Sequence, residues 1–552
     1  MESRGSDSAA AMSASSIRPS SADEKASSPI MEYHHYRHHH GHDASHPTPA
    51  YPPSYDSPPS SDAGTGEVRE QQQQDGQVLS EAYRKVDWTI MPLMFLCYLL
   101  QFLDKVIINY ANIMGLQRDL SLHGDDFSWM ATIFFVGYAV AELPQGYLLQ
   151  RFPIARVLGI NVILWGVVVC CTAAVQDFAG AAVLRAILGV LEAVVTPALI
   201  VITSQWYARD QATPRTGVWY CGLGAGQIIG GLISWAAQHG SAGGSFPSWR
   251  IMFVSVGAFN VGVGAAVVLF LPSTIRAARF LSEAEKQAIE ASLARDRLAG
   301  GSGEERNVFR KEDLWEALCD LQVWLLFLNT VLIVIPSGII TTFSATLIHS
   351  FGYDAKASAL LNMPSGVVSI AATIGGTYAI RERFPRWLGI CALLVPTMAG
   401  AGLMSFAGSS KASALAGIYL INFDVAPLAL IYALAGANAA GYTKRVATSA
   451  LVSIAFSLAN IIGPQTFRTA DAPGYMPAKM TVFAVCGASI VVTVLLRLLY
   501  GARNGRKEAA AAAASDTCEE VDCDSMQAEV GQADSGEGCW TDRTNPGFRY
   551  VY

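Results

Sequence analysis

Residues 185–197 read Arg-Ala-Ile-Leu-Gly-Val-Leu-Glu-Ala-Val-Val-Thr-Pro and place Arg185 and Glu192 in a run that is otherwise apolar from Ala179 to Val201. A helix crosses a bilayer in about 20 residues, so this run predicts a membrane-spanning helix. A charged side chain at the bilayer centre costs about 2.5–3.5 kcal/mol. Two charges in one spanning helix therefore require partners, water or a function.

Arg185 and Glu192 are seven residues apart, which on a helix is nearly two turns and about 10 Å along one face. One interpretation is that each charge serves an internal ion pair that only fixes helix packing. The other is that a cationic anchor and a titratable carboxyl line a water-filled cavity. We favour the second, because polar residues also occur inside several other apolar runs of the chain.

The composition indicates a membrane protein. Of 552 residues, 51% are hydrophobic and only 15% are charged, and the mean hydropathy is +0.31, which is too apolar for an ordinary soluble protein. The ten cysteines are scattered without paired spacing, so neither a disulfide framework nor a zinc site is predicted and reduced thiols are expected. The polar N-terminus lacks the apolar core of a cleavable signal peptide.

Twelve apolar runs predict an all-α membrane protein with two six-helix bundles. The runs are 88–113, 127–149, 155–175, 179–206, 214–237, 250–271, 321–349, 357–380, 387–407, 412–434, 446–467 and 478–500. The expected domains are a disordered N-terminal segment (1–80), the first bundle (81–271), a central linker (272–320), the second bundle (321–501) and a tail (502–552). In the linker, Ser282 and Glu285 are typical of a capping box that opens an amphipathic helix to Leu298.

Basic residues gather on alternate loops and at both ends of the chain. The first spanning run is preceded by Arg84 and Lys85, and the last is followed by Arg503, Arg506 and Lys507. The positive-inside rule therefore places both termini and the central linker in the cytoplasm, as the even number of spans also requires. A histidine cluster between His34 and His46 is compatible with metal binding, but we interpret it as low-complexity sequence and predict no metal site.

Other polar residues also fall inside apolar runs. In the first, Lys105, Asn109 and Asn112 share one helical face, while Asp104 points about 100° away and is either a packing partner or a proton-binding group. In the second, Glu142 lies near Arg151 and is either a gate or a ligand contact.

The fifth run is rich in glycine, which favours close helix packing. Gln227 is its polar exception and is expected to face the cavity. Asn438 of the second half is one of several unusual intramembrane amides.

Several catalytic and nucleotide-binding motifs are absent. The chain has no G-x-x-x-x-G-K-[ST] loop, no H-E-x-x-H, no G-x-S-x-G and no dinucleotide fingerprint. We therefore predict no enzyme activity, no cofactor and no nucleic-acid partner. Any driving energy would have to come from an ion gradient or from the substrate's own gradient. Protons are the natural coupling ion, because buried carboxyls can bind and release them.

Five short segments carry a family resemblance. They are Leu103-Asp104-Lys105 with Asn109-Tyr110-Ala111, Glu142-Leu-Pro-Gln with Gln150-Arg151, the Arg185–Pro197 stretch, Asn438-Ala-Ala-Gly-Tyr-Thr-Lys-Arg445 with Asn460-Ile-Ile-Gly-Pro-Gln-Thr-Phe467 and Asp471-Ala-Pro-Gly-Tyr475, and Thr541-Asp542 with Asn545 and Phe548-Arg549-Tyr550. Together these resemble motifs of the major facilitator superfamily and, within it, of the fungal allantoate permease family of anion:cation symporters. Gly146 and Tyr442 replace the family's usual Asn and His, which leaves the substrate open.

The resemblance implies the major facilitator fold and proton-coupled uptake of a small organic anion such as allantoate, nicotinate, pantothenate or biotin. It implies that Arg185 anchors the substrate carboxylate, that Glu192 carries the proton and that Lys105 is a second cation. The full set of expected site residues is Arg185, Lys105, Asn109, Gln227 and Asn438 for substrate, Glu192 and Asp104 for proton coupling, and Glu142, Arg151, Lys444 and Arg445 for gating.

The expected protein is a monomeric, multi-pass carrier in the plasma membrane, whose partners are an anionic small molecule, a proton and membrane lipid. Two other functions stay open at this point. One is export of a secondary metabolite, which efflux assays would separate from uptake. The other is a nutrient sensor without measurable flux, for which the long terminal segments offer room.

Overall fold

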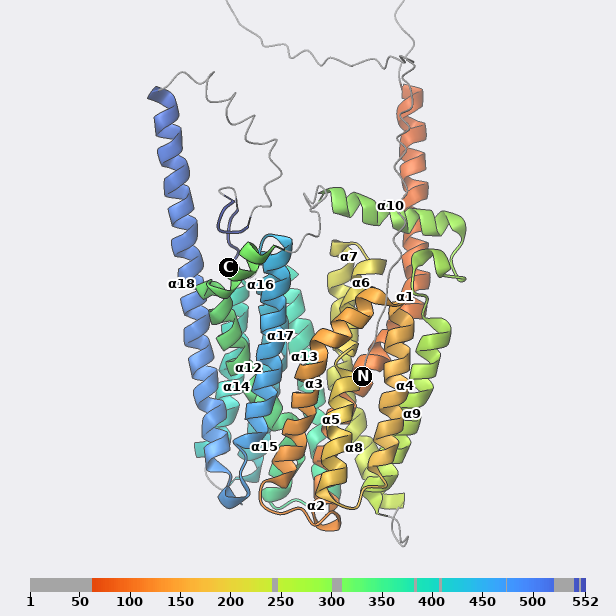
Figure 1. The fold of residues 1–552 in the computed structure, drawn as a ribbon, viewed down its shortest axis with the longest axis vertical. Coiled ribbons are helices and arrows are strands. Elements are labelled where there is room, and N and C mark those ends of the chain that lie inside the picture. Colours follow the sequence, from red (N-terminus) through yellow and green to blue (C-terminus); the bar gives the residue numbers. More distant parts are fainter. Residues whose placement is uncertain are drawn as a thin grey trace, which may run out of the picture. The chain divides into compact units, whose positions relative to one another are not determined.

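The computed structural model describes residues 62–240, 247–299, 310–381, 385–406, 410–472, 474–520, 541–545 and 548–552. These residues are almost entirely helical, and the helices form two groups that correspond to the two halves of the sequence (Figure 1). The first half contains α1 (Asp62–Ile113), α2 (Leu116–Asp119), α3 (Asp126–Arg151), α4 (Ile154–Thr172), α5 (Phe178–Glu192), α6 (Val195–Trp206), α7 (Arg209–Tyr220), α8 (Gly222–Gly240) and α9 (Ser248–Phe270).

The linker contributes η1 (Ile275–Ala277), α10 (Glu283–Ala299) and α11 (Lys311–Leu318). The second half contains α12 (Leu321–Ser350), α13 (Ala355–Arg381), α14 (Arg386–Phe406), α15 (Lys411–Ile421), η2 (Asn422–Asp424), α16 (Val425–Asn438), α17 (Tyr442–Gln465), η3 (Thr469–Asp471) and α18 (Met476–Glu520). Within the halves, α4 packs on α9, α3 on α5, and α12 on α17 and α18. The halves meet where α8 packs on α13 and α3 on α17.

Among the described residues, 11 helical segments are long and apolar enough to cross a membrane. The expected span at 214–237 is the one that falls outside this set. There the chain forms two helices, α7 and α8, that meet at Cys221. Helix α8 contains several glycines together with Gln227 and Gln238. The all-helical, multi-span fold predicted from the sequence is confirmed.

Two boundaries differ from the sequence prediction. Helix α1 begins at Asp62, so residues 62–80, which we expected to be disordered, are helical. Helix α18 continues through the run Ala509–Ala514 into the expected tail. Alanine has the highest helix propensity of all residues, which explains this extension. The His-rich cluster of the N-terminal segment lies outside the described residues.

The linker helix α10 opens with the predicted capping box. The Ser282 N–H donates to Glu285 Oε2 at 2.8 Å, and the Glu285 N–H donates to Ser282 Oγ at 3.3 Å. Lys85 Nζ of α1 lies 2.6 Å from Glu285 Oε1, and this pairing lowers the pKa of Glu285. The cap and the ion pair together fix α10 against α1.

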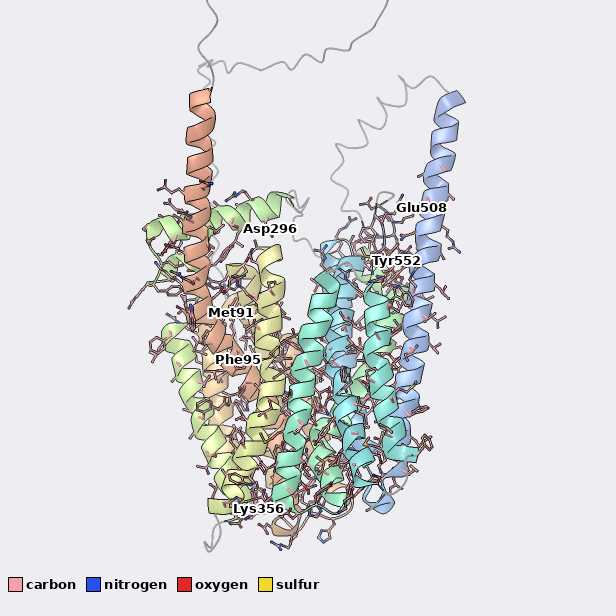
Figure 2. All side chains as sticks on the ribbon, turned by 180° about the vertical axis from the view of Figure 1, so that it is seen from behind. Met91, Phe95, Asp296, Lys356, Glu508 and Tyr552 are labelled. Atoms are coloured by element: carbon pink, nitrogen blue, oxygen red, sulfur yellow. The ribbon has the colours of Figure 1, made fainter. Side chains whose placement is uncertain are left out.

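The two halves are tied together at the end of the helices opposite α10 and Tyr552. Asn109 Nδ2 of α1 donates to Ser344 Oγ of α12 at 2.8 Å, and Asn362 Nδ2 of α13 donates to the Tyr110 hydroxyl at 3.1 Å. At the same end the Phe343 ring faces Phe467, with ring centroids 4.0 Å apart. Figure 2 shows Lys356 at this end, whereas Asp296 and Tyr552 lie at the other. This side of the molecule is therefore closed.

The last residues of the chain dock onto the second half at the opposite end. Lys444 Nζ is fully buried and lies 2.8 Å from an oxygen of Glu316, of Asp320 and of Asp542. Asn438 holds the backbone of Val551 with both amide atoms, donating at 2.8 Å and accepting at 2.7 Å. Tyr550 donates to Asp542 Oδ2 at 2.8 Å. The C-terminal segment thus completes a buried network of charges.

Asp320 makes the stability of this network depend on pH. Burial disfavours its charged form, but hydrogen bonds from Arg503 and Lys444 outweigh burial and lower the pKa of Asp320. Such a group stabilises the fold above its unfolded pKa of about 3.9, and the contribution is lost as pH falls through the folded pKa.

We predict that Asp320→Asn lowers the melting temperature of the detergent-purified protein at neutral pH, because Lys444 and Arg503 each lose a charged partner. The difference from wild type should shrink on acidification. Glu290→Gln, in an exposed pair with Arg276, is the matched control and should leave the melting temperature unchanged. Equal melting curves for Asp320→Asn and wild type at neutral pH would contradict this role.

Candidate functional site

A buried ion pair joins α1 and α5 in the interior of the first half. Lys105 Nζ contacts Glu192 Oε1, and the Glu192 side chain is completely buried while 12% of the Lys105 side chain is exposed. Lys105 also donates to the Gln101 carbonyl oxygen at 3.1 Å and lies 5.3 Å from the centroid of the Phe134 ring. The two charges neutralise each other where neither has enough water to be solvated alone.

Arg185 and Asp104 form a second pair of opposite charges beside the first. Both side chains are buried, and they lie within electrostatic range of each other. In the described part of the chain, Nε and Nη2 of Arg185 and both carboxylate oxygens of Asp104 have no hydrogen-bond partner. Arg185 therefore keeps donors available for another anion, in the forked geometry that suits a carboxylate.

The helix break beside Glu192 results from a proline. Helix α5 ends at Glu192 and α6 begins at Val195. Pro197 has no N–H to donate to the carbonyl oxygen of Ala193, so the helix is interrupted just after the carboxyl. A side chain at a helix break can be re-aimed by a small change in the backbone, which suits a group that must change partners.

Helices α3 and α5 pack closely against each other beside the site. A Cβ atom at Gly189 would collide with the Phe134 carbonyl oxygen, and one at Gly137 would collide with that of Ala186. Glycine has no side chain, so the two backbones can come close together, as is common between membrane helices. This approach places the Phe134 and Tyr138 rings over Lys105.

Tyrosines between the two halves were not among the expected site residues. Tyr98 of α1 and Tyr220 of α7 have ring centroids 5.1 Å apart. Tyr138 interacts with Thr196 and Gln101, and it lies within electrostatic range of Tyr432 of α16, which is 38% exposed. Tyr98 is seven residues before Lys105, so the two share a helical face, and this spacing could have revealed it.

The structure does not bring all expected residues to this cluster. Asn109 bonds Ser344 at the closed end, and the side chain of Gln227 is buried with no partner for Nε2 among the described residues. Glu142 is partly buried and interacts with Ser453 of α17.

Other expected residues lie at the end that carries the C-terminal segment or face outward. Asn438 and Lys444 hold that segment, as described above, and Arg445 Nε donates to the Ala439 carbonyl oxygen at 3.3 Å. Arg151 is exposed. The proposed anchor, proton carrier and second cation are therefore close together, whereas the proposed gating residues are dispersed.

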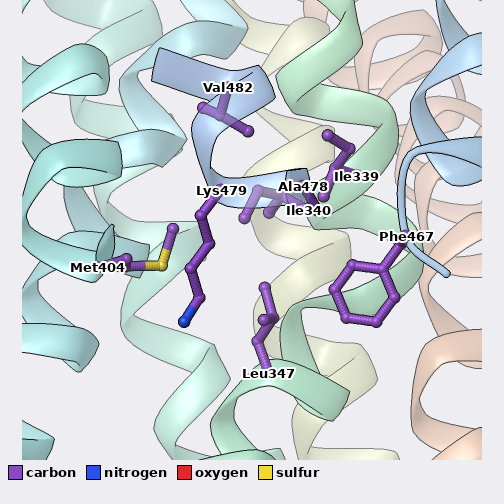
Figure 3. A pocket seen from close by; sticks show the side chains of 8 residues that line it. All are labelled: Ile339, Ile340, Leu347, Met404, Phe467, Ala478, Lys479 and Val482. Carbon is purple, nitrogen blue, oxygen red and sulfur yellow. The ribbon is translucent and has the colours of Figure 1, made fainter. Parts of the chain in front are cut away.

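A small apolar pocket lies in the second half, and none of the residues of the charged cluster lines it (Figure 3). It is lined by Ile339, Ile340, Leu347, Met404, Phe467, Ala478, Lys479 and Val482. Figure 3 shows the Lys479 amine extending between the apolar side chains of α12 and α14. In the described ranges, no group of three or more His, Cys, Asp or Glu side chains is arranged to hold a metal ion. The charged cluster between α1 and α5 is the stronger candidate site.

Comparison with known proteins gives consistent matches. Residues 94–464 match the model of the Major Facilitator Superfamily. The chain is 32% identical to the allantoate permease of Saccharomyces cerevisiae, covering 85% of each chain. It is 36% identical to the "Thiamine pathway transporter THI73" of the same yeast, covering 72% of this chain and 75% of that one.

Solved structures with the same fold include a D-xylose-proton symporter. It has a TM-score of 0.56 at 12% identity, with 74% of this chain and 97% of that chain covered. A bacterial homologue of the human lysosomal transporter Spinster, in an inward-facing and occupied conformation, has a TM-score of 0.54 at 17% identity, with 74% and 96% covered.

We predict that Lys105→Met destabilises the protein, because it leaves Glu192 buried without its cation. Removing one partner of a buried pair costs about 3–5 kcal/mol. The double variant Lys105→Met/Glu192→Gln should recover most of the loss, because no charge is then left unpaired. Thermal unfolding followed by tryptophan fluorescence measures both effects.

The control for this experiment is Arg276→Met, which breaks an ion pair with Glu290 on α10 in which both side chains are exposed. Exposed ion pairs contribute little to stability, so little change is expected. The buried ion pair would have no structural importance if Lys105→Met unfolded at the same temperature as Arg276→Met.

Proposed function

Because the chain belongs to the major facilitator superfamily and is a multi-pass membrane transporter, we propose that it takes up a small organic anion together with a proton. The single observation that carries this proposal is the buried charge cluster between α1 and α5, in which Lys105 pairs with Glu192 and Arg185 lies beside Asp104. Two cations balanced by two acids hold no net charge. A substrate carboxylate can enter such a site only if an acid is neutralised.

Protonation of Glu192 supplies that neutralisation. When Glu192 takes a proton, Lys105 loses its ionic partner and, with the free donors of Arg185, can bind the incoming carboxylate. The occupied site then has the same net charge as the empty one. Proton and anion therefore enter and leave together, because either alone would leave an unpaired charge in a poorly solvated interior.

The arrangement of the two halves supports alternating access. With both termini in the cytoplasm, as the basic loops predict, the closed end formed by Asn109, Ser344 and Phe467 faces outward. In this orientation the contacts that close one end of the molecule lie on the outer side, as an inward-facing state requires. The cycle requires the contacts at this end to separate while the cytoplasmic ends of the halves approach each other.

The cluster also favours a compact substrate with polar groups beside its carboxylate. Tyr98, Tyr138, Tyr220 and Tyr432 offer rings and hydroxyls around the cationic groups. An amide, ureide or heteroaromatic ring would use both properties. Relatives named for allantoate, for a thiamine pathway and for cysteine suit this class of small polar compounds.

The test is uptake of a panel of radiolabelled small carboxylates at two external pH values, in cells that lack their own uptake route. We predict that Glu192→Gln abolishes pH-driven accumulation but still exchanges labelled for unlabelled substrate, because glutamine imitates the protonated acid permanently. Glu290→Gln on α10 should behave as wild type. Uptake by Glu192→Gln with unchanged pH dependence would remove Glu192 from the coupling step, and faster efflux than uptake would indicate an exporter.

A further inference from the structure

Parts of the two halves of the chain repeat with the same offset. The fourth span begins at Phe178 with α5 and the tenth at Lys411 with α15, a difference of 411 − 178 = 233. Asp87, which precedes the first apolar run, and Asp320, which caps α12, differ by the same 320 − 87 = 233. In these spans the offset gives a residue of the first half a counterpart in the second.

The counterpart of Glu192 is position 425, and Asp424 is its immediate neighbour. Both acids lie at an interruption of their helix. Glu192 ends α5, and Asp424 ends η2, the single turn of 3₁₀-helix between α15 and α16. A proline follows each break, at Pro197 and at Pro427. The sequence thus places a carboxyl beside a helix break in both halves.

Asp424 differs from Glu192 because it has no cationic partner in the part of the chain that the structure describes. It is 3% exposed, and its Oδ2 has no hydrogen-bond partner among the described residues. Apart from Glu382, it is the only Asp or Glu between Asp354 and Asp471. Helices α12 and α16 contain no Asp, Glu, Lys or Arg, and in α13, α14 and α15 such residues occur only near the helix ends. An ionised carboxylate in this setting is strongly disfavoured.

The groups around Asp424 are polar but neutral. Asn422 in the same turn is joined to Ser369 of α13 by a contact of 3.5 Å. The titratable groups within electrostatic range are Tyr220 at the end of α7 and Cys486 of α18. Tyr220 lies against Tyr98, which shares a face of α1 with Lys105. Asp424 therefore borders the tyrosine cluster (Tyr98, Tyr138, Tyr220 and Tyr432) at Tyr220.

We propose that Asp424 is a second proton-binding carboxyl, located in the second half and loaded in the same cycle as Glu192. It binds a proton when the tyrosine cluster encloses it and releases the proton when this region opens to water. This inference rests on the proposed uptake function. Two protons with one monoanion move one net positive charge inward, whereas one proton with one monoanion moves none.

The test is uptake of a monocarboxylate into proteoliposomes with an inside-negative potassium diffusion potential, with and without an imposed pH gradient. We expect the potential to increase the wild-type initial rate several-fold. Asp424→Asn should lose the stimulation by potential but keep the stimulation by the pH gradient, which depends on Glu192. Asp424→Glu should restore the stimulation by potential, and Glu290→Gln should match wild type.

Three outcomes would overturn the proposal. The first is that the membrane potential stimulates uptake by Asp424→Asn as strongly as uptake by wild type. The second is that uptake by wild type does not respond to the potential. The third is that stimulation of uptake by the potential requires Na⁺ at constant pH, which would mean that Asp424 binds a metal cation and not a proton. Absence of pH-driven uptake by wild type would refute the proposed function. This result differs from the three outcomes above, which concern only the second proton. Because asparagine has the shape of the neutral acid, Asp424→Asn should elute as wild type in size-exclusion chromatography.

Discussion

The structure depends on the cost of placing charge inside a membrane protein. Lys105 and Glu192 are tolerated between α1 and α5 because each is the other's partner. Isolation of either group in this interior would cost several kcal/mol. The same cost makes the pair sensitive to protonation, because a proton on Glu192 removes the negative charge that holds Lys105 in place. In the proposed mechanism, the same contact meets a structural requirement and a coupling requirement.

The rest of the fold positions this contact and controls access to it. Glycine contacts bring α3 close to α5, and Pro197 interrupts the helix just after Glu192. Hydrogen bonds such as that from Asn109 to Ser344 close the end opposite α10 and Tyr552. At the other end the network around Lys444 holds the C-terminal segment on the second half. The pair therefore lies in the middle of a molecule that is closed on one side.

The sequence predicted the helical spans, the linker helix and the family, because hydropathy and capping are local properties. It also drew attention to Arg185, Glu192, Lys105 and Asp104, because a charge inside an apolar run is conspicuous, and their roles stay predictions. It did not predict which charge pairs with which. Glu192 contacts Lys105 of another helix, and only the packing of α1 on α5 decides that.

The tyrosine cluster and the role of Asn438 were missed for a similar reason. Tyrosine is common in membrane helices, so Tyr220 and Tyr432 gain significance only when the two halves are brought together. Asn438 was expected to bind substrate, but it holds Val551, a residue more than a hundred positions away in the sequence. Such long-range partners leave no periodic signal in the chain.

The central claim is that proton and anion move together through the charge cluster. The most direct measurement uses proteoliposomes that contain a pH-sensitive dye and start with equal pH on both sides. An inward gradient of substrate alone is then applied. We expect the lumen to acidify as the substrate enters. Entry of substrate with no change in lumenal pH would contradict it.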